Sequence, residues 1–238
     1  MGSNLQIQQL LRTGIVTNIA KALHLQSFSN ANFDWKPYLQ LADWLQEQQL
    51  IAPTINALEL LLLELFSLES ICLAEHNLEQ IPSNFGVLSN LKQLDLSYNK
   101  LHMIPMSLGM LPKIEQLELQ GNQLLALPES IGLLPTLKHL DLSNNQLSIL
   151  PDSLAQLLHL QHLSIANNQL LEIPTDIAWL SNLKTLHLQG NQITVIPTFI
   201  KELQQLEILD LSNNPIPKNA LLKVQTLLPT CKIIVGQS

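Results

Sequence analysis

The stretch LKHLDLSNNQLSILPDSLAQLLH, residues 137–159, decides the fold because its pattern returns every 23 residues along the chain. The leucines that belong to the repeating pattern fall at places 1, 4, 6, 11, 14, 18 and 21, with asparagine at place 9 and proline at place 15. Repeats with this apolar pattern begin at Leu68, Leu91, Ile114, Leu137, Leu160, Leu183 and Leu206. A long pattern that recurs with no slip in spacing indicates a solenoid of stacked copies of one unit.

Each part of the repeat predicts a local structure. Apolar and polar residues alternate around places 3 to 7, as in a strand with one buried face. The asparagine at place 9 falls where the chain leaves the strand, so its amide is positioned to hydrogen-bond the backbone of neighbouring coils. The proline at place 15 fixes φ and starts the next segment without needing an N–H donor. Strands spaced by about 4.8 Å would give an eight-stranded ridge about 35 Å long.

This repeat resembles the leucine-rich repeat family, over about residues 68–238. In detail it is similar to the 23-residue intracellular type with an Ile/Leu-Pro step, as in Ras-suppressor-like scaffolds and many bacterial proteins. The resemblance implies an α/β fold: a curved solenoid with a parallel sheet on its concave face and short helical or 3-10 turns on its convex face. The resemblance does not identify a particular binding partner, because it rests on the chemistry of the repeat alone.

Both ends of a solenoid need caps, because a terminal coil would expose its core. Residues 1–67 contain no repeat and are predicted to form a helical N-terminal cap of three helices, with a second binding module as the alternative. In the second helix, which would begin near Asp34, four apolar residues share one face: Tyr38, Leu41, Ala42 and Leu45. Residues 68–238 form the predicted repeat domain, and residues 219–238 its C-terminal cap.

Composition argues against several functional classes. The 12 lysine and arginine residues and the 19 acidic residues give a net charge of −7. This charge disfavours binding to nucleic acid or to an anionic membrane. The two cysteines, Cys72 and Cys231, lie too far apart in sequence to suggest a metal site or a disulfide framework. The N-terminal residues lack the pattern of a secretory signal, which favours a reduced, cytoplasmic protein. No phosphate-binding, dinucleotide-binding, hydrolase or zinc-protease motif occurs, so we expect no enzyme activity and no cofactor.

The outward strand positions carry the information about partners. At place 5, Asp95, Glu118 and Asp141 follow one another in neighbouring coils, and Asp210 stands further along the same column. Such a column favours a protein partner with a basic segment, although a solvated acidic face is the simpler alternative. Tyr98, an aromatic residue at place 8, is the predicted anchor.

Three histidines gather near this column. His139 and His162 occupy adjacent positions at place 3, and His187 is diagonal to them at place 5. Side chains on parallel strands point outward together rather than converging, so we predict no metal site. Two interpretations of these histidines remain: they contact a partner, or they make partner binding depend on pH.

The convex side offers a second candidate interface. Met110, Leu133 and Trp179 share place 20, and Phe199 holds another variable position one coil away. Apolar residues exposed in a row can mark an interface. Incidental exposure, or packing of Trp179 over its own coil, is the alternative, and a monomer is favoured.

Three functions follow. The favoured one is a non-enzymatic scaffold or adaptor that binds a partner protein on the concave face. A bacterial effector delivered into a host cell, using the repeats to bind a host protein, is the alternative. The third, an enzyme, would need a convergent polar pocket between the helical cap and the first coils.

Overall fold

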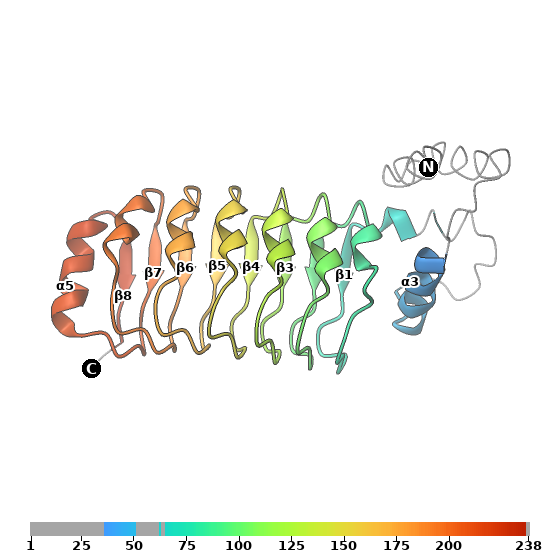
Figure 1. The fold of residues 1–238 in the computed structure, drawn as a ribbon, viewed down its shortest axis with the longest axis horizontal. Coiled ribbons are helices and arrows are strands. Elements are labelled where there is room, and N and C mark those ends of the chain that lie inside the picture. Colours follow the sequence, from blue (N-terminus) through green and yellow to red (C-terminus); the bar gives the residue numbers. More distant parts are fainter. Residues whose placement is uncertain (1–35, 51–61, 63–64, 237–238) are drawn as a thin grey trace.

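A computed structural model of the chain describes residues 36–50, 62 and 65–236. The first predicted N-terminal helix and most of the third lie outside the described residues. Within the described part, the chain forms an open solenoid of stacked coils, with a parallel sheet along one side and short helical turns along the other (Figure 1).

Eight parallel strands form one sheet, and their order in the sheet is their order in the chain. Each of the first six strands pairs with the next at an offset of 23 residues, so that Leu117 lies opposite Leu140 and Leu140 opposite Leu163, and β7 pairs with β8 at an offset of 24. The parallel sheet predicted from the repeat is therefore confirmed. The strands are β1 (Ser70–Cys72), β2 (Gln93–Asp95), β3 (Gln116–Glu118), β4 (His139–Asp141), β5 (His162–Ser164), β6 (Thr185–His187), β7 (Ile208–Asp210) and β8 (Lys232–Ile234).

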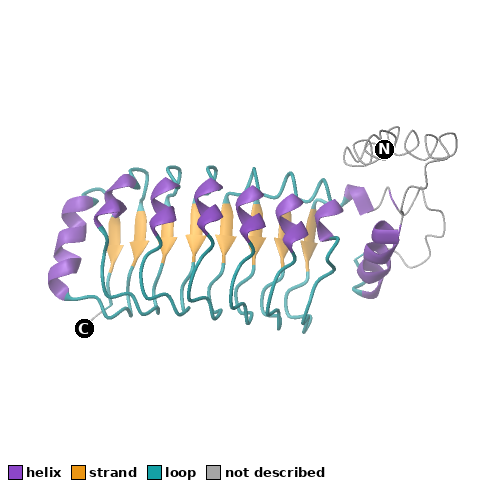
Figure 2. Cartoon of the chain, viewed as in Figure 1, coloured by secondary structure: helices purple, strands orange, loops and turns teal. Residues whose placement is uncertain are grey.

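Short 3-10 helices line the opposite side of the coils (Figure 2). From the second helix on, the repeat proline immediately precedes each turn with φ between −60° and −75°, as proline requires. Proline thus starts each turn, as the sequence predicts. The turns are η1 (Phe85–Val87), η2 (Met106–Met110), η3 (Glu129–Leu133), η4 (Asp152–Gln156), η5 (Thr175–Trp179) and η6 (Thr198–Glu202).

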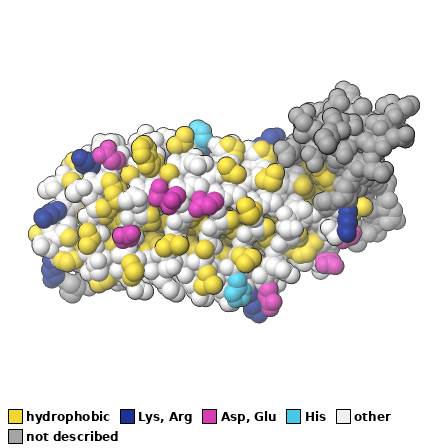
Figure 3. Space-filling view, viewed as in Figure 1, with side chains coloured by type: hydrophobic (Ala, Val, Ile, Leu, Met, Phe, Trp, Pro, Cys, Tyr) yellow, Lys and Arg dark blue, Asp and Glu magenta, His cyan; other side chains and the backbone are white. Residues whose placement is uncertain are grey.

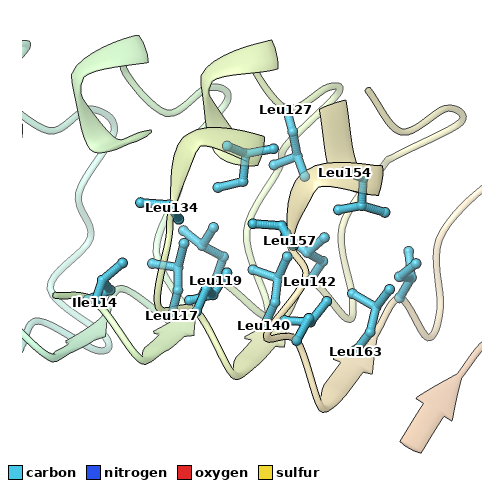
Figure 4. Close-up of a cluster of buried hydrophobic side chains, with 14 of the residues drawn as sticks. Ile114, Leu117, Leu119, Leu127, Leu134, Leu140, Leu142, Leu154, Leu157 and Leu163 are labelled. Atoms are coloured by element: carbon cyan, nitrogen blue, oxygen red, sulfur yellow. The ribbon is translucent and has the colours of Figure 1, made fainter. Parts of the chain in front are cut away.

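The core is a continuous stack of leucine and isoleucine side chains between the sheet and the turns. Leu117, Leu140 and Leu163, from three neighbouring strands, are each 2% exposed or less. Figure 4 shows leucines of adjacent coils interleaving between strand and turn. No coil could bury its own leucines alone, so stacking creates the core.

Buried asparagines satisfy the backbone where each coil leaves its strand. Asn145 donates from Nδ2 to the carbonyl oxygens of Leu119 and Leu142, both at 3.0 Å. Its Oδ1 accepts the N–H of Leu124, also at 3.0 Å. The bonding predicted for the repeat asparagine is therefore confirmed, and the same links to the neighbouring coils recur at Asn99, Asn122, Asn168, Asn191 and Asn214.

The N-terminal helix α3 (Lys36–Glu47) covers the first coil. The apolar face predicted for it is confirmed, since its four apolar residues are buried in the core that the repeats share. The ring of Trp44 meets that of Phe85 edge-on, with 6.0 Å between centroids, so this tryptophan packs inward rather than offering a binding surface. The boundary of the predicted cap at residue 67 stays a prediction.

At the other end, α5 (Lys218–Leu227) replaces the short turn, and β8 completes the sheet. Cys231 is buried there at 4% exposure, as a small apolar residue would be. Across the described ranges, no helix is long and apolar enough to cross a membrane.

Glycine at place 19 lets the first turns approach closely. A Cβ on Gly109 would overlap the carbonyl oxygen of Ser130 in the next turn, and Gly86 and Gly132 have equivalent neighbours. Toward the C-terminus the glycine gives way to Ala155, and adjacent turns then pack less closely. The spacing of the convex side therefore changes along the solenoid.

Candidate functional site

The outward strand positions form straight columns across the sheet. Asp95 lies in register with Glu118, and Glu118 with Asp141. The same column begins with Cys72 and continues through Ser164 and His187 to Asp210. The structure therefore brings the three acidic residues side by side, while Asp210 is separated from them by two coils. We call Asp95, Glu118 and Asp141 the acidic column.

The aspartates at place 5 also close the strands. Asp95 Oδ1 accepts the backbone N–H of Ser97 at 2.9 Å, and Asp141 Oδ1 accepts that of Ser143 at 2.8 Å. Asp210 repeats this turn, and its Oδ1 also accepts the hydroxyl of Ser212 at 2.7 Å. One carboxylate oxygen of each aspartate therefore has a structural role, which an analysis of charge alone misses.

In the part of the chain that the structure describes, no lysine or arginine forms an ion pair with the acidic column. Glu118 accepts a hydrogen bond from the amide of Gln116 at 2.8 Å, and Asp95 accepts one from the thiol of Cys72 at 3.7 Å. Both donors are neutral. The ion pairs among the described residues lie elsewhere, at Lys92–Glu69, Lys138–Glu115 and Lys201–Glu202. The acidic column is therefore open to a cation from outside.

Place 8 forms a column in which every residue adopts the left-handed backbone conformation. Its members are Glu75, Tyr98, Gly121, Asn144, Asn167, Gly190 and Asn213. Glycine and asparagine tolerate positive φ, but a bulky side chain there is an outlier. Tyr98 has φ of 52°. A comparison of the repeats could have found this strain, because tyrosine replaces the Asn or Gly that most other coils have at place 8. The apolar periodicity of the strands does not reveal the strain.

Tyr98 presents its ring on the surface beside the acidic column. The side chain is 55% exposed, and the ring covers Gly121 of the next coil, where a Cβ would lie 2.5 Å from ring atom Cδ1. The glycine thus makes room for the ring. Backbone strain at an exposed aromatic side chain is typical of functional positions.

The histidines form a stacked pair. The rings of His139 and His162 lie 4.3 Å apart between centroids, with 10° between their planes. His162 Nδ1 is 2.6 Å from the hydroxyl of Thr185. Burial, and then the neighbouring His139, lower the pKa of His162. Together with His187 and Asp141 they line a shallow depression of about 230 Å³ on the concave face.

Stacked rings do not converge on one point. Among the residues that the structure describes, no group of three histidine, cysteine, aspartate or glutamate side chains is placed to hold a metal ion. The arrangement suits contact with a partner surface, with the stacked rings as a flat, polar platform.

On the convex side, three of the four predicted interface residues are strongly exposed. Met110, Leu133 and Trp179 are 56%, 60% and 69% exposed, so Trp179 does not fold over its own coil. Phe199 is only partly exposed and packs against the core, so it offers less surface than the other three. Figure 3 shows the face that carries the turns, with hydrophobic side chains scattered over it and acidic ones both near its middle and toward its edges.

A pocket of about 240 Å³ lies between α3 and the first coils, the place where the third predicted function, an enzyme, would need its site. Its walls include the apolar side chains of Tyr38, Phe66, Val87 and Met110. Among the described residues that line it, the polar groups belong to Tyr38, two serines and one asparagine, and none is a histidine, cysteine or carboxylate. The described lining therefore offers no base of the usual kind to activate a nucleophile.

Comparisons with known proteins agree with this architecture. Family profiles described as Leucine rich repeat match residues 66–124 and 159–216, and related profiles match residues 135–180 and 205–228. No curated protein matches the chain at a significant level.

Several solved structures are similar. A leucine-rich repeat protein of Leptospira interrogans is 32% identical over 71% of this chain and 49% of its own, with a TM-score of 0.58. Internalin C2 of Listeria monocytogenes is 27% identical over 73% and 83% of the two chains, with a TM-score of 0.53.

A plant structure shows the same fold with a ligand. The ectodomain of the membrane receptor kinase GASSHO1/SCHENGEN3 of Arabidopsis thaliana, in complex with CASPARIAN STRIP INTEGRITY FACTOR 2, is 34% identical over 64% of this chain and 19% of its own, with a TM-score of 0.57. The chain thus spans about half of the Leptospira protein and a fifth of the plant ectodomain. On its profiles, its 23-residue repeat and its parallel solenoid, the chain belongs to the leucine-rich repeat family.

Proposed function

We propose that this protein is a non-enzymatic cytoplasmic scaffold or adaptor whose concave face binds a partner protein carrying a basic segment. Leucine-rich repeat domains generally serve protein–protein interaction, and the solenoid offers an extended surface for it. The observation that carries the proposal is the acidic column, which is in register across three strands and forms no ion pair with a described lysine or arginine.

Binding would follow a rigid-template mechanism. The sheet is prefolded, so the scaffold loses little conformational entropy when the partner docks. The acidic column would attract and orient lysine or arginine side chains, which chiefly raises the association rate and the specificity. Tyr98 would supply the aromatic anchor beside it, and a cation over its ring would add about 0.5–2 kcal/mol.

The histidine platform would extend this surface toward the C-terminus. His139 lies on the same strand as Asp141, and His162 and His187 lie one and two coils beyond it, so all three would contact the continuation of the same segment. Asp210, at the C-terminal end of the same line of place-5 residues, would bind a further basic group.

The experiment compares partner capture by three forms of the chain. The concave variant replaces the acidic column with Asp95→Asn, Glu118→Gln and Asp141→Asn, which keeps the oxygen that caps Ser97 and Ser143 while removing the charge. A control variant removes three charges elsewhere, by Glu79→Gln, Glu202→Gln and Glu207→Gln, at exposed positions.

We expect the wild type and the control to retain the same partners from cell lysate. The concave variant should lose at least one of them, and the affinity of that partner for the wild type should fall with added salt. Unchanged capture by the concave variant would overturn the proposal.

A second candidate is a bacterial effector delivered into a host cell. Two similar structures come from bacteria, which motivates it. A reporter fused to the chain and followed into host cells separates the two, since a resident adaptor would not be delivered.

A further inference from the structure

A stripe of exposed apolar side chains runs along one edge of the solenoid. Each coil from the second to the sixth contributes one large apolar residue at place 12 or 13, between the buried asparagine and the proline. These residues are Met103, Leu125, Ile149, Leu171 and Val195, and their exposure ranges from 58% to 72%. At one strand spacing per coil the stripe is about 20 Å long.

The fold does not require these residues to be apolar. The first coil carries Glu79 and Gln80 at the same two places, and the seventh carries Pro217 and Lys218. Their neighbours within the stripe, such as Ser148 and Glu172, are polar and equally exposed. Scattered apolar exposure is ordinary, but one large apolar side chain in each of five consecutive coils makes a continuous surface.

The stripe deepens into a groove between the fourth and fifth coils. Ile149 and Leu171 line the same depression with Pro174, and its volume is about 550 Å³. This shared groove shows that residues at place 12 and place 13 face a common space. A volume of this size falls in the range of binding pockets.

The rim of the groove is acidic. Asp152, Glu172 and Asp176 line it, and no lysine or arginine does. The sequence contains no lysine or arginine between Lys138 and Lys184, so no such side chain in this stretch neutralises these carboxylates. The hydroxyl of Thr175 donates to Asp176 at 3.4 Å, which leaves the charge of the rim in place.

We infer that this edge is a second docking surface, separate from the concave face, for a partner segment that carries apolar side chains flanked by lysine or arginine. The apolar side chains would fill the groove at Ile149 and Leu171. The flanking cations would meet the acidic rim, and the complementary charge would fix the direction of the segment.

The test uses peptides selected from a random library of about twelve residues, displayed on phage, against the wild-type chain. The affinity of each enriched peptide is then measured by fluorescence anisotropy for the wild type and for three variants. The groove variant is Ile149→Ser with Leu171→Gln. The rim variant is Asp152→Asn with Glu172→Gln and Asp176→Asn. The control variant changes exposed apolar residues elsewhere, Leu158→Gln with Leu222→Gln. Thermal unfolding shows that all are folded.

We expect enriched peptides that combine apolar residues with lysine or arginine. They should bind the groove variant at least tenfold more weakly, as loss of a central apolar contact usually does. They should bind the rim variant more weakly and with less dependence on salt, and the control variant with unchanged affinity. The concave variant should also bind them unchanged, which separates this surface from the proposed function.

Equal affinity for the groove variant, a selection that yields no basic peptides, or loss of binding by the concave variant alone would each overturn the inference. Self-association of the wild type that the groove variant abolishes would also overturn it, because the occupant would then be a second copy of the chain.

Discussion

Replacing Asn145 by alanine tests how the coils are held together. Asn145 is 8% exposed and bridges three places in the backbone, the carbonyls of Leu119 and Leu142 and the N–H of Leu124. Alanine provides none of these hydrogen bonds. The cavity it leaves is enclosed by the neighbouring coils, where Leu119, Leu124 and Leu142 are fully buried.

The size of the effect follows from the groups left without a partner. An unsatisfied buried polar group costs about 1–3 kcal/mol. The N–H of Leu124 loses its partner, whereas the carbonyls of Leu119 and Leu142 keep the amides of Asn122 and Asn168. With the loss of the other two hydrogen bonds, the free energy of unfolding should fall by about 2–3 kcal/mol. This is a large share of the 5–15 kcal/mol that stabilises a typical domain.

Urea unfolding followed by circular dichroism measures the change. The control is Gln146→Ala, at the next residue, whose exposed side chain should contribute less than about 0.5 kcal/mol. A loss of less than about 1 kcal/mol for Asn145→Ala, or equal losses for the two variants, would refute the view that these asparagines hold neighbouring coils together.

Four further results are expected. Gly109→Ala should lower the free energy of unfolding by about 1–3 kcal/mol, since its Cβ meets the carbonyl of the next turn; an unchanged urea midpoint would contradict the close packing. Tyr98→Asn should raise the free energy of unfolding by about 1 kcal/mol by relieving the strain at positive φ, while weakening partner binding; a destabilised variant would argue against that strain. The lowered pKa of His162 means that its neutral form is favoured in the folded state, so the stability it contributes is present above pH 6.5 and lost as the pH falls through the folded pKa. Urea midpoints from pH 7.5 to 5 should therefore fall less for His162→Gln than for the wild type, and parallel curves would be evidence against this. In the native protein, a thiol reagent should modify exposed Cys72 quickly and buried Cys231 only after unfolding, because burial raises the pKa of the Cys231 thiol; rapid reaction at two thiols would count against this burial.

Repeat chemistry made the scaffold predictable. The spacing of Leu137, Asn145 and Pro151 indicates a strand, a buried bridge and a turn start, and the structure has all three at those places. These elements depend on local periodicity and on contacts with an identical neighbour, so one coil predicts the next. The columns at places 3 and 5 follow directly from that register.

The surface was harder to predict, because it depends on how side chains settle once the coils are stacked. Phe199 and Trp179 both occupy variable places, yet the phenylalanine leans onto the core and the tryptophan does not. Similarly, a carboxylate at place 5 reads as free charge in the sequence, but Asp141 uses one oxygen to cap Ser143. The groove at Ile149 and Leu171 requires the positions of two coils together, and no single repeat contains it.

The glycines at place 19 make the coils unequal partners for one another. At Gly86, Gly109 and Gly132 a Cβ would lie within 2.2 Å of a carbonyl oxygen of the next turn, so these three turns have no room for a side chain at this place. The later coils carry Ala155, Ala178 and Lys201 there. A later coil therefore could not replace one of the first three without pushing the neighbouring turn away, although all the coils share the same leucines, asparagine and proline.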